Sequence, residues 1–429
     1  MIFFLPFIAM IVAFLLGVPI AFALAGAGAL GIWLVTGDWN IVMGVLGMAP
    51  FNSVANYVLT TIPMFILMAQ LSSSSGLAND LYNVASDWLS GLRGGLAIAT
   101  VFACAIFGAM SGASVAAASV MSKIAMPNMR RFGYSEVLAA GSIGVGSTLD
   151  ILIPPSVAMV VYGILTETSI GKLLIAGVVP GIVLAILLAL VIWVWVTINP
   201  SLAPKIRTTS WRNRLKNLYR ILPSLLLILM VLVLLYTGIA TPTEVGALGA
   251  FMAAAIGLAL GRLTWSGLVE ALKETVQGTV MIFMILIGAT IFSQFMTMSQ
   301  VPQKIIAIIT EMNLNRWIVM IFIIVAYFVI SMFMDEIPLM VITLQLTFPL
   351  IVSLEFDPIW YGVLTCLLIA MGLVFPPVGM IAFIVSATAD VDLVKVYKGT
   401  SVLIIAIFLT TILIMIFPQI VLWLPLKMH

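Results

Sequence analysis

Long apolar runs constrain the fold of this chain more than any other feature. Only 8% of the 429 residues are charged, whereas soluble domains have roughly 25%. A spanning helix needs about 20 mostly apolar residues, so we predict an all-α integral membrane protein with about 12 membrane segments. The clear segments are 2–34, 95–118, 174–198, 221–240, 244–260, 279–298, 317–334 and 401–425; weaker or interrupted ones lie near 57–72, 137–165, 338–353 and 359–386.

The first apolar run is expected to stay in the protein. The first basic residue is Arg93, and a cleavable signal peptide normally begins with a positive region. We therefore predict a retained helix over 1–35, bent near Pro19. Cys104 and Cys366 lie inside apolar segments, and the single histidine is His429, so neither a disulfide nor a metal centre is predicted beyond an alkali cation.

A basic loop follows the segment that ends near residue 198. It contains no acid, and the positive-inside tendency places it in the cytoplasm. Residues 211–219 are also compatible with an amphipathic helix on the membrane surface, and nucleic-acid binding is not expected. The cations of this loop are Lys205, Arg207, Arg212, Arg214, Lys216 and Arg220.

The chain carries an internal repeat. Pro154-Pro155 recurs as Pro376-Pro377, 222 residues later. The other matches are Pro127 with Pro349 and Thr166 with Thr388 at the same offset, and Gln70 with Gln294 and Ser75 with Ser299 at an offset of 224. The predicted parts are an N-terminal helix and connection (1–49), repeat 1 (50–200), a basic loop with linking helices (201–269) and repeat 2 (270–429). Whether the repeats are inverted or parallel depends on the number of crossings between them, although inversion is common in transporters.

The double prolines break apolar segments in both repeats. Consecutive prolines remove backbone donors and forbid a regular helix. Main-chain carbonyls freed in hydrocarbon must be buried in protein or line a cavity. Broken segments at matching positions of two halves are the best sequence sign of a transporter binding site.

Small and acidic residues lie near these breaks. Gly108, Ser111 and Ser114 suit a hard cation such as Na⁺, although close helix packing explains small residues equally well. Asp150 is either a cation ligand, because a carboxylate inside a membrane needs a partner, or the N-cap of a half-helix. Asp335, followed by Glu336, starts a helix or binds a cation.

Helix N-termini at the breaks attract anions. We therefore predict that an acidic substrate is held near Thr148 and Ser156 in the first half and near Gly379 in the second.

The sequence resembles the large membrane subunit of tripartite ATP-independent periplasmic (TRAP) transporters, and the match covers almost the whole chain. The resemblance rests on motifs in both halves. They are 62–65, 93–96, 111–116, 133–134, 148–156, 162–163, 168–171, 176–177 and 179–181 in the first half, and 357–362 and 372–379 in the second.

The resemblance implies a sodium-coupled secondary importer of small organic anions in the bacterial cytoplasmic membrane, with Na⁺ as coupling ion and no other cofactor. It also implies an elevator-type transport domain, a small four-helix membrane subunit and a periplasmic substrate-binding protein. The sodium sites carried over from the family are Gly108, Ser111, Asp150, Ile153 and Pro154 in the first half, and Ser331, Gly372, Phe375 and Val378 in the second.

The chain departs from the family pattern at three of these positions. Asp150 and Ser331 stand where glycine is usual, and Phe375 stands where threonine is common. Backbone carbonyl ligands survive such changes, but a threonine hydroxyl at 375 does not. The sequence leaves open a passive anion channel or a membrane-embedded enzyme as alternatives, and it does not identify the organic anion.

Overall fold

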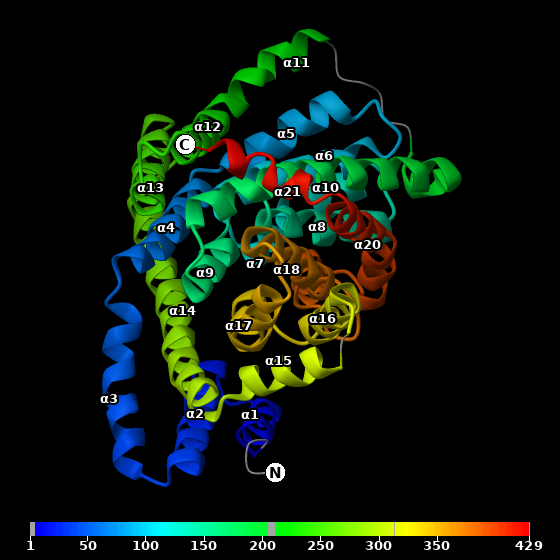
Figure 1. The fold of residues 1–429 in the computed structure, drawn as a ribbon. Coiled ribbons are helices and arrows are strands. Elements are labelled where there is room, and N and C mark those ends of the chain that lie inside the picture. The colour runs from blue at the N-terminus through cyan, green and yellow to red at the C-terminus, as the bar shows by residue number, and fades with distance from the viewer. Residues whose placement is uncertain (1–4, 205–210, 313, 429) are drawn as a thin grey trace.

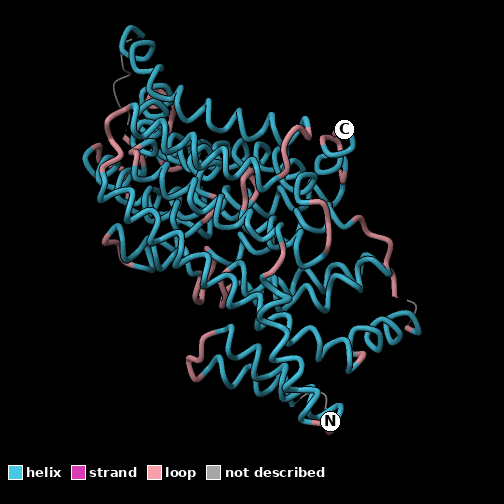
Figure 2. Tube along the Cα trace, turned by 90° about the vertical axis from the view of Figure 1, so that its left-hand side faces the viewer, coloured by secondary structure: helices cyan, strands magenta, loops and turns pink. Residues whose placement is uncertain are grey.

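The computed structural model describes residues 5–204, 211–312 and 314–428. Every regular element in this part of the chain is helical (Figures 1 and 2). The two ends of the chain lie at opposite ends of the molecule in both views. Among these described residues, seven helices are long and apolar enough to cross a membrane, and seven shorter helices are also apolar. The prediction of an all-α membrane fold is confirmed.

The helices of the first half and its short 3-10 turns follow one another closely. They are α1 (Leu5–Leu15), α2 (Ile20–Thr36), α3 (Trp39–Val54), η2 (Tyr57–Thr60), α4 (Thr61–Ser74), α5 (Leu77–Leu89), α6 (Gly95–Ser111), α7 (Ser114–Arg131), α8 (Glu136–Ser147), η3 (Thr148–Ile151), α9 (Val157–Thr166), α10 (Ile170–Ile198) and η4 (Pro200–Leu202).

The second half contains α11 (Trp211–Asn217), η5 (Leu218–Ile221), α12 (Leu222–Thr237), α13 (Pro242–Ala259), α14 (Trp265–Ser299), α15 (Val301–Glu311), α16 (Arg316–Ser331), α17 (Glu336–Ser353), α18 (Pro358–Leu373), α19 (Met380–Ala389), α20 (Leu393–Ile416), α21 (Gln419–Leu422) and η6 (Pro425–Lys427).

Helices of the two halves correspond in order and spacing. α7 and α17 begin at Ser114 and Glu336, 222 residues apart. The starts of α8 and α18 are separated by the same interval, and so are those of α2 and α13. In the first half, α3 and α4 are separate helices, whereas the corresponding part of the second half is the single 35-residue helix α14. The part boundaries given above stay a prediction.

Packing between the halves is reciprocal. α2 packs against α14, and α13 packs against α4 (Figure 1). α19 packs against α7, and α17 packs against α9. Exchanging the two halves turns the α2–α14 contact into the α13–α4 contact, and the α7–α19 contact into the α17–α9 contact. A twofold relation between two bodies produces this reciprocity.

Small residues bring these helices together. A Cβ atom on Gly28 of α2 would lie 2.7 Å from the backbone nitrogen of Phe292 in α14. A Cβ atom on Gly288 of α14 would overlap the carbonyl oxygen of Ala21 in α2. Helix backbones in membranes approach this closely only where both faces carry small side chains. At the corresponding α4–α13 contact, the Thr61 and Thr243 hydroxyls form a buried hydrogen bond of 2.7 Å.

The N-terminal run bends where the sequence predicts. α1 ends at Leu15 and α2 begins at Ile20, directly after Pro19. Gly17 between them has a φ of +76°, a conformation that favours glycine. Residues 1–4 lie outside the described part.

The predicted basic loop is described only from residue 211, so Lys205 and Arg207 lie outside the described residues. α11 lies beside α5 (Figure 1). The rings of Trp211 and Trp88 meet at 5.9 Å, and Asn217 Nδ2 donates to Asp87 Oδ2 at 2.7 Å. The helix expected over 211–219 is therefore present as α11 followed by a 3-10 turn.

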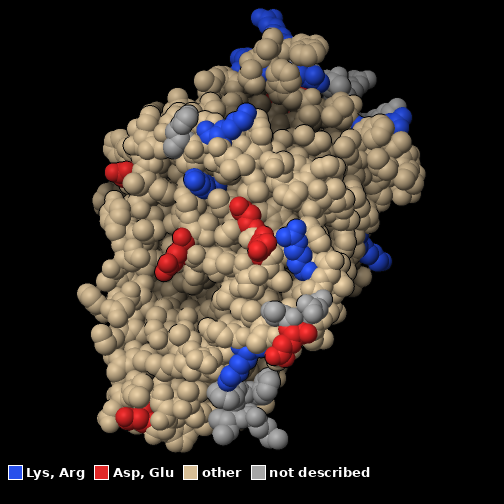
Figure 3. Space-filling model, viewed as in Figure 1, with Lys and Arg blue, Asp and Glu red and all other residues tan. Residues whose placement is uncertain are grey.

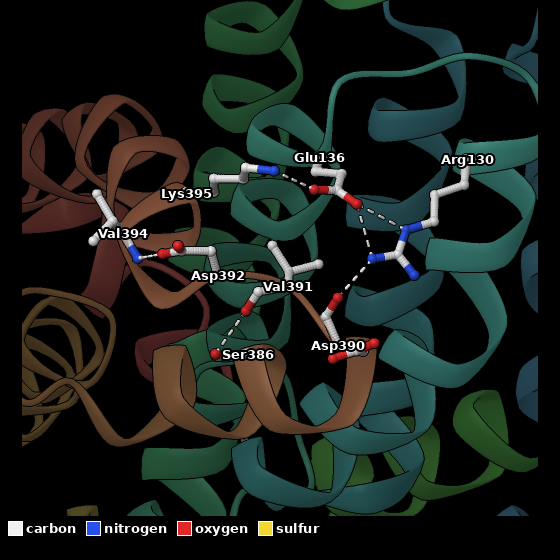
Figure 4. Close-up of polar contacts among 8 residues, drawn as sticks. All are labelled: Arg130, Glu136, Ser386, Asp390, Val391, Asp392, Val394 and Lys395. Atoms are coloured by element: carbon white, nitrogen blue, oxygen red, sulfur yellow. Dashed lines mark hydrogen bonds and ion pairs between the residues drawn. The ribbon is translucent and has the colours of Figure 1, made fainter.

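A polar network joins the two halves at the molecular surface (Figure 4). Glu136 at the start of α8 pairs with Arg130 at 2.9 Å and with Lys395 of α20 at 2.7 Å. Arg130 also donates to the carbonyl oxygen of Asp390 at 2.8 Å. The hydrogen bond from Lys395, followed by that from Arg130, lowers the pKa of Glu136.

We predict that Glu136→Gln destabilises the purified protein at pH 7 by less than about 1 kcal/mol, because all three side chains are partly exposed to solvent. The folded-state pKa of Glu136 lies below its unfolded value, so its contribution is present above the unfolded pKa and is lost as pH falls through the folded pKa. Thermal unfolding in detergent at neutral and acid pH measures the difference.

Glu274→Gln, on an exposed position of α14, is the matched control. An effect of Glu136→Gln that grows on acidification contradicts this assignment.

Candidate functional site: two breaks that meet between the halves

The first break separates α6 from α7. α6 ends at Ser111, and Gly112 follows with a φ of +61°. A Cβ atom at Gly112 would lie 2.6 Å from the carbonyl oxygen of Pro155, so the break packs directly on the double proline. The Gly112 carbonyl accepts a hydrogen bond from the Val157 amide at 3.3 Å. The two interruptions of the first half are therefore one structural unit.

The second break repeats this arrangement between α16 and α17. α16 ends at Ser331, and the Met332 carbonyl accepts from the Gly379 amide at 3.0 Å. Gly379 corresponds to Val157 at the offset of 222. The half-helices α9 and α19, which follow the double prolines, have ten residues each. They are too short to span a membrane.

Each break holds a contact between one glycine and one larger residue. In the first half, a Cβ atom on Gly108 would lie 2.6 Å from Asp150 Cβ. In the second half, a Cβ atom on Gly372 would overlap the Ser331 hydroxyl. Gly372 corresponds to Asp150 at the offset of 222. In the first half the glycine (Gly108) therefore lies in the helix before the break, whereas in the second half it lies in the segment before the double proline. Each contact has room for the side chain of only one of the two residues, so the two backbones approach closely in both halves.

The two breaks meet at the start of α7 and α17. The Ser114 hydroxyl donates to Asp150 Oδ1 at 2.7 Å and lies 3.4 Å from Glu336 Oε2. Ser114 and Glu336 are corresponding residues, 222 positions apart. Corresponding residues touch one another only near the axis that relates two halves. The contact therefore places that axis between the breaks.

Polar atoms at this meeting point lack partners within the protein. Ser111 and Asp150 are both at least 98% buried. The Ser111 hydroxyl and Asp150 Oδ2 make no hydrogen bond. Ser111 lies three residues after Gly108, hence on the α6 face that contacts Asp150. In the described residues, no basic side chain pairs with Asp150, Asp335 or Glu336.

Most predicted sodium-site residues of the first half lie together at this point. Gly108, Ser111, Ser114 and Asp150 belong to the contacts above, and Pro154 forms a cis peptide bond with Pro155. Asp150 lies in η3, whereas the N-cap of α9 is Ser156, whose hydroxyl accepts from the Met159 amide. The interpretation of Asp150 as a half-helix cap was therefore wrong. The side chain of Ile153 faces Gly181 of α10.

In the second half the predicted residues are partly engaged elsewhere. Asp335 caps α17 by accepting from the Glu336 amide at 2.9 Å, so the helix-start interpretation of Asp335 is confirmed. The Ser331 hydroxyl donates to the Phe328 carbonyl at 3.0 Å. The Phe375 ring packs against Phe328 with centroids 5.3 Å apart.

The Val378 carbonyl accepts from the Tyr397 hydroxyl at 2.7 Å. Its remaining lone pair leaves the carbonyl able to bind a cation.

The predicted substrate residues lie beside the breaks. The Thr148 hydroxyl donates to the Val145 carbonyl at 2.8 Å, and the Gly379 amide donates to the Met332 carbonyl. Ser156 is fully buried, and its hydroxyl oxygen accepts from Met159, which leaves the hydroxyl proton available. Of the three, Ser156 is the one whose donor the protein does not consume.

Sequence reasoning noted Glu336 only beside Asp335, in an acidic pair within an apolar stretch, and did not select it as a site residue of its own. A further sequence signal is its position, 222 residues after Ser114. Thr400 is a second such residue, because its hydroxyl donates to the Val374 carbonyl at 2.8 Å, just before the second double proline.

The available ligand atoms are oxygens. Cys104 and Cys366 are buried and not disulfide-bonded. Across the described ranges, no group of three or more His, Cys, Asp or Glu side chains is arranged to hold a metal ion. Hydroxyl, carboxylate and main-chain carbonyl oxygens suit a hard cation. The geometry thus fits an alkali cation better than a transition metal.

A polar hollow lies among α3, α9, α14, α15 and α17. Figure 3 shows that the face of the molecule is hollowed where α9, α14 and α17 lie in Figure 1. The cavity has a volume of about 530 Å³. Gln345 of α17 lines this cavity, and its side-chain amide donates to the Ala289 carbonyl of α14 at 3.0 Å. Its polar lining residues are Asn52, Ser53, Glu167, Thr290, Ser293, Gln294, Thr297, Gln303 and Gln345.

Comparison with known proteins identifies the family. Residues 7–420 match the family model described as "Tripartite ATP-independent periplasmic transporter, DctM component". This chain belongs to that family. It is thus a multi-pass transporter permease of the bacterial inner membrane rather than an enzyme.

Relatives agree over nearly the full length. The chain is 34% identical to the C4-dicarboxylate TRAP transporter large permease protein DctM of Pseudomonas aeruginosa, covering 93% of this chain and 92% of that one. It is 27% identical to the sialic acid TRAP transporter large permease protein SiaM of Vibrio cholerae, covering 95% of each. The YdaH transporter of Alcanivorax borkumensis has a similar fold, with a TM-score of 0.62, 14% identity and coverage of 91% and 89%.

We predict that Gly108→Ala destabilises this TRAP permease by about 1–3 kcal/mol, because the new Cβ would overlap Asp150 and force the two backbones apart. Gly44→Ala in α3 is the matched control, since nothing lies within 4 Å of a Cβ there. Alanine at that helical position is expected to be neutral or to stabilise by up to about 1 kcal/mol. Thermal unfolding of both variants in detergent tests the contact, and equal melting temperatures would contradict it.

Proposed function

We propose that this TRAP permease imports a small organic anion by coupling its movement to sodium entry. The observation that carries the proposal is the meeting of two equivalent helix breaks around buried oxygen atoms without partners. Such atoms are costly inside a membrane protein unless a ligand satisfies them. Sodium is a hard cation that carbonyl and hydroxyl oxygens satisfy well.

The proposed sodium sites lie one at each break. The first comprises Ser111 with main-chain oxygens near Gly108, Asp150, Ile153 and Pro154. The second comprises main-chain oxygens near Ser331, Gly372, Phe375 and Val378. Support comes from the equivalence of the two breaks: each contains one glycine contact and one hydrogen bond from the half-helix to the break carbonyl.

The proposed substrate is a carboxylate or a related organic anion. The two relatives above are named for C4-dicarboxylates and sialic acid. Ser156, the N-cap of α9, is the favoured substrate donor, with Thr148 at the start of η3 and Gly379, the N-cap of α19, beside it. A positive cation on the carbonyl side of each break would favour an anion on the adjacent amide side.

The proposed movement is of the elevator type. The inner helices α6–α10 and α16–α20 would move as one body against α2–α4, α13 and α14. The polar hollow between α9, α17 and α14 supports this division, because a dry, close-packed interface would resist sliding. The further proposed partners are a small four-helix membrane subunit and a periplasmic binding protein that delivers the anion.

We predict that the permease, reconstituted in liposomes with its small subunit and its binding protein, accumulates substrate only when an inward sodium gradient is present. Uptake that depends only on the substrate gradient would instead indicate a passive channel, and conversion of the substrate without flux would indicate an enzyme. Radiolabelled substrate measures both.

We predict that Ser111→Ala raises the sodium concentration for half-maximal uptake by about tenfold, which corresponds to the loss of one ligand worth about 1.4 kcal/mol. Ser122→Ala is the matched control, because this α7 hydroxyl is also buried and without a partner. Equal sodium dependence in the two variants would exclude Ser111 from the site.

A further inference from the structure

We infer that Asp150, Ser114 and Glu336 form a separate binding site for one additional sodium ion, located between the two halves. This inference rests on the proposed sodium coupling, but its ligands differ from those of the two break sites. The ligands here are side-chain carboxylates and a hydroxyl. They come from both halves of the chain, whereas each break site belongs to one half.

Geometry brings the three residues together. Ser114 Oγ lies 2.7 Å from Asp150 Oδ1 and 3.4 Å from Glu336 Oε2. A hydroxyl has one proton and two acceptor lone pairs. Ser114 gives its single proton to Asp150, so its lone pairs and the nearby Glu336 carboxylate remain available to a cation.

The three side chains of this site are buried, so their charge and hydrogen-bonding groups need partners inside the protein. Asp150 and Glu336 are 0% and 6% exposed, and Ser114 is 2% exposed. Each buried carboxylate needs a compensating partner. In the described ranges, no lysine or arginine pairs with either. A bound cation supplies the missing positive charge.

One buried oxygen of this site has no hydrogen-bond partner within the protein. Asp150 Oδ2 is buried without a hydrogen-bond partner, although its sister oxygen is bonded to Ser114. This oxygen is free to contact a cation.

The ion is assigned as monovalent from the ligand count. Among the described residues, no three acidic side chains converge to hold a metal ion. Divalent calcium takes six to eight oxygen ligands and favours more carboxylates. Two carboxylates and one hydroxyl, completed by water or main-chain oxygens, suit an alkali cation.

The site exists once, not twice. The counterpart of Asp150 is Gly372, and the counterpart of Glu336 is Ser114. Exchanging the halves therefore gives a glycine in place of the aspartate, so no second copy of the carboxylate pair arises. The chain thereby gains one ion beyond the pair that its repeat would supply, and each cycle would carry one more positive charge.

The test counts sodium ions on the purified chain in the absence of substrate, using ²²Na⁺ binding and sodium-dependent thermal stabilisation. Wild type is expected to bind one ion more than Glu336→Gln and Asp150→Asn. Ser114→Ala is expected to weaken that ion by at least about tenfold, the scale on which ligand-supporting groups act at metal sites. Glu355→Gln, at an exposed position in the turn after α17, is the control and should bind as wild type does.

The outcomes separate this inference from the proposed function. If wild type binds sodium in a Ser111-dependent manner but Glu336→Gln and Asp150→Asn bind the same number of ions with unchanged affinity, only the additional site is refuted. If wild type binds no sodium, the proposed function fails as well. If Glu336→Gln leaves sodium binding intact and changes only the pH dependence of uptake, the pair binds a proton and the inference is overturned.

Ser114→Ala removes only a hydroxyl, so it decides the case if the carboxylate variants do not fold. Unchanged sodium affinity in Ser114→Ala would then refute the site.

Discussion

The structure depends on one constraint: a helix broken inside a membrane protein must find new partners for the main-chain groups it releases. Here each break finds part of them in the other interruption of the same half. The Val157 amide bonds to Gly112, and the Gly379 amide bonds to Met332. These bonds hold the breaks against the double prolines, and they leave other oxygen atoms nearby without a hydrogen-bond donor. The groups left over are those around which the proposed ion sites are built.

The twofold relation explains why the breaks meet. Helices α2 with α14 and α13 with α4 form equivalent outer contacts, and α7 with α19 and α17 with α9 form equivalent inner contacts. Reciprocal packing of this kind brings the starts of α7 and α17 together, so Ser114 and Glu336 touch. Repetition supplies two similar breaks, and the differences between the copies supply what is particular to this TRAP permease. Asp150 opposite Gly108, and Gly372 opposite Ser331, are the clearest example.

Much of this architecture follows from the sequence. Apolar run lengths predict the membrane helices, and the 222-residue offset predicts which breaks correspond, because both depend on local composition. The role of Asp150 could not be predicted, since an aspartate before a double proline suits a cap as well as a buried site. The structure excludes the cap, because Ser156 already caps α9. The sequence marked Glu336 only as the neighbour of Asp335, because its contact with Ser114 joins the two halves and no local pattern encodes it.

The central claim is that the two breaks are equivalent cation-binding points on either side of the axis between the halves. High-resolution maps of the purified protein with sodium, and with sodium replaced by a large organic cation, test it directly. The account predicts density at both breaks, beside Ser111 in one and Gly372 in the other, that appears only with sodium. Maps that are identical in the two conditions at both breaks would contradict it.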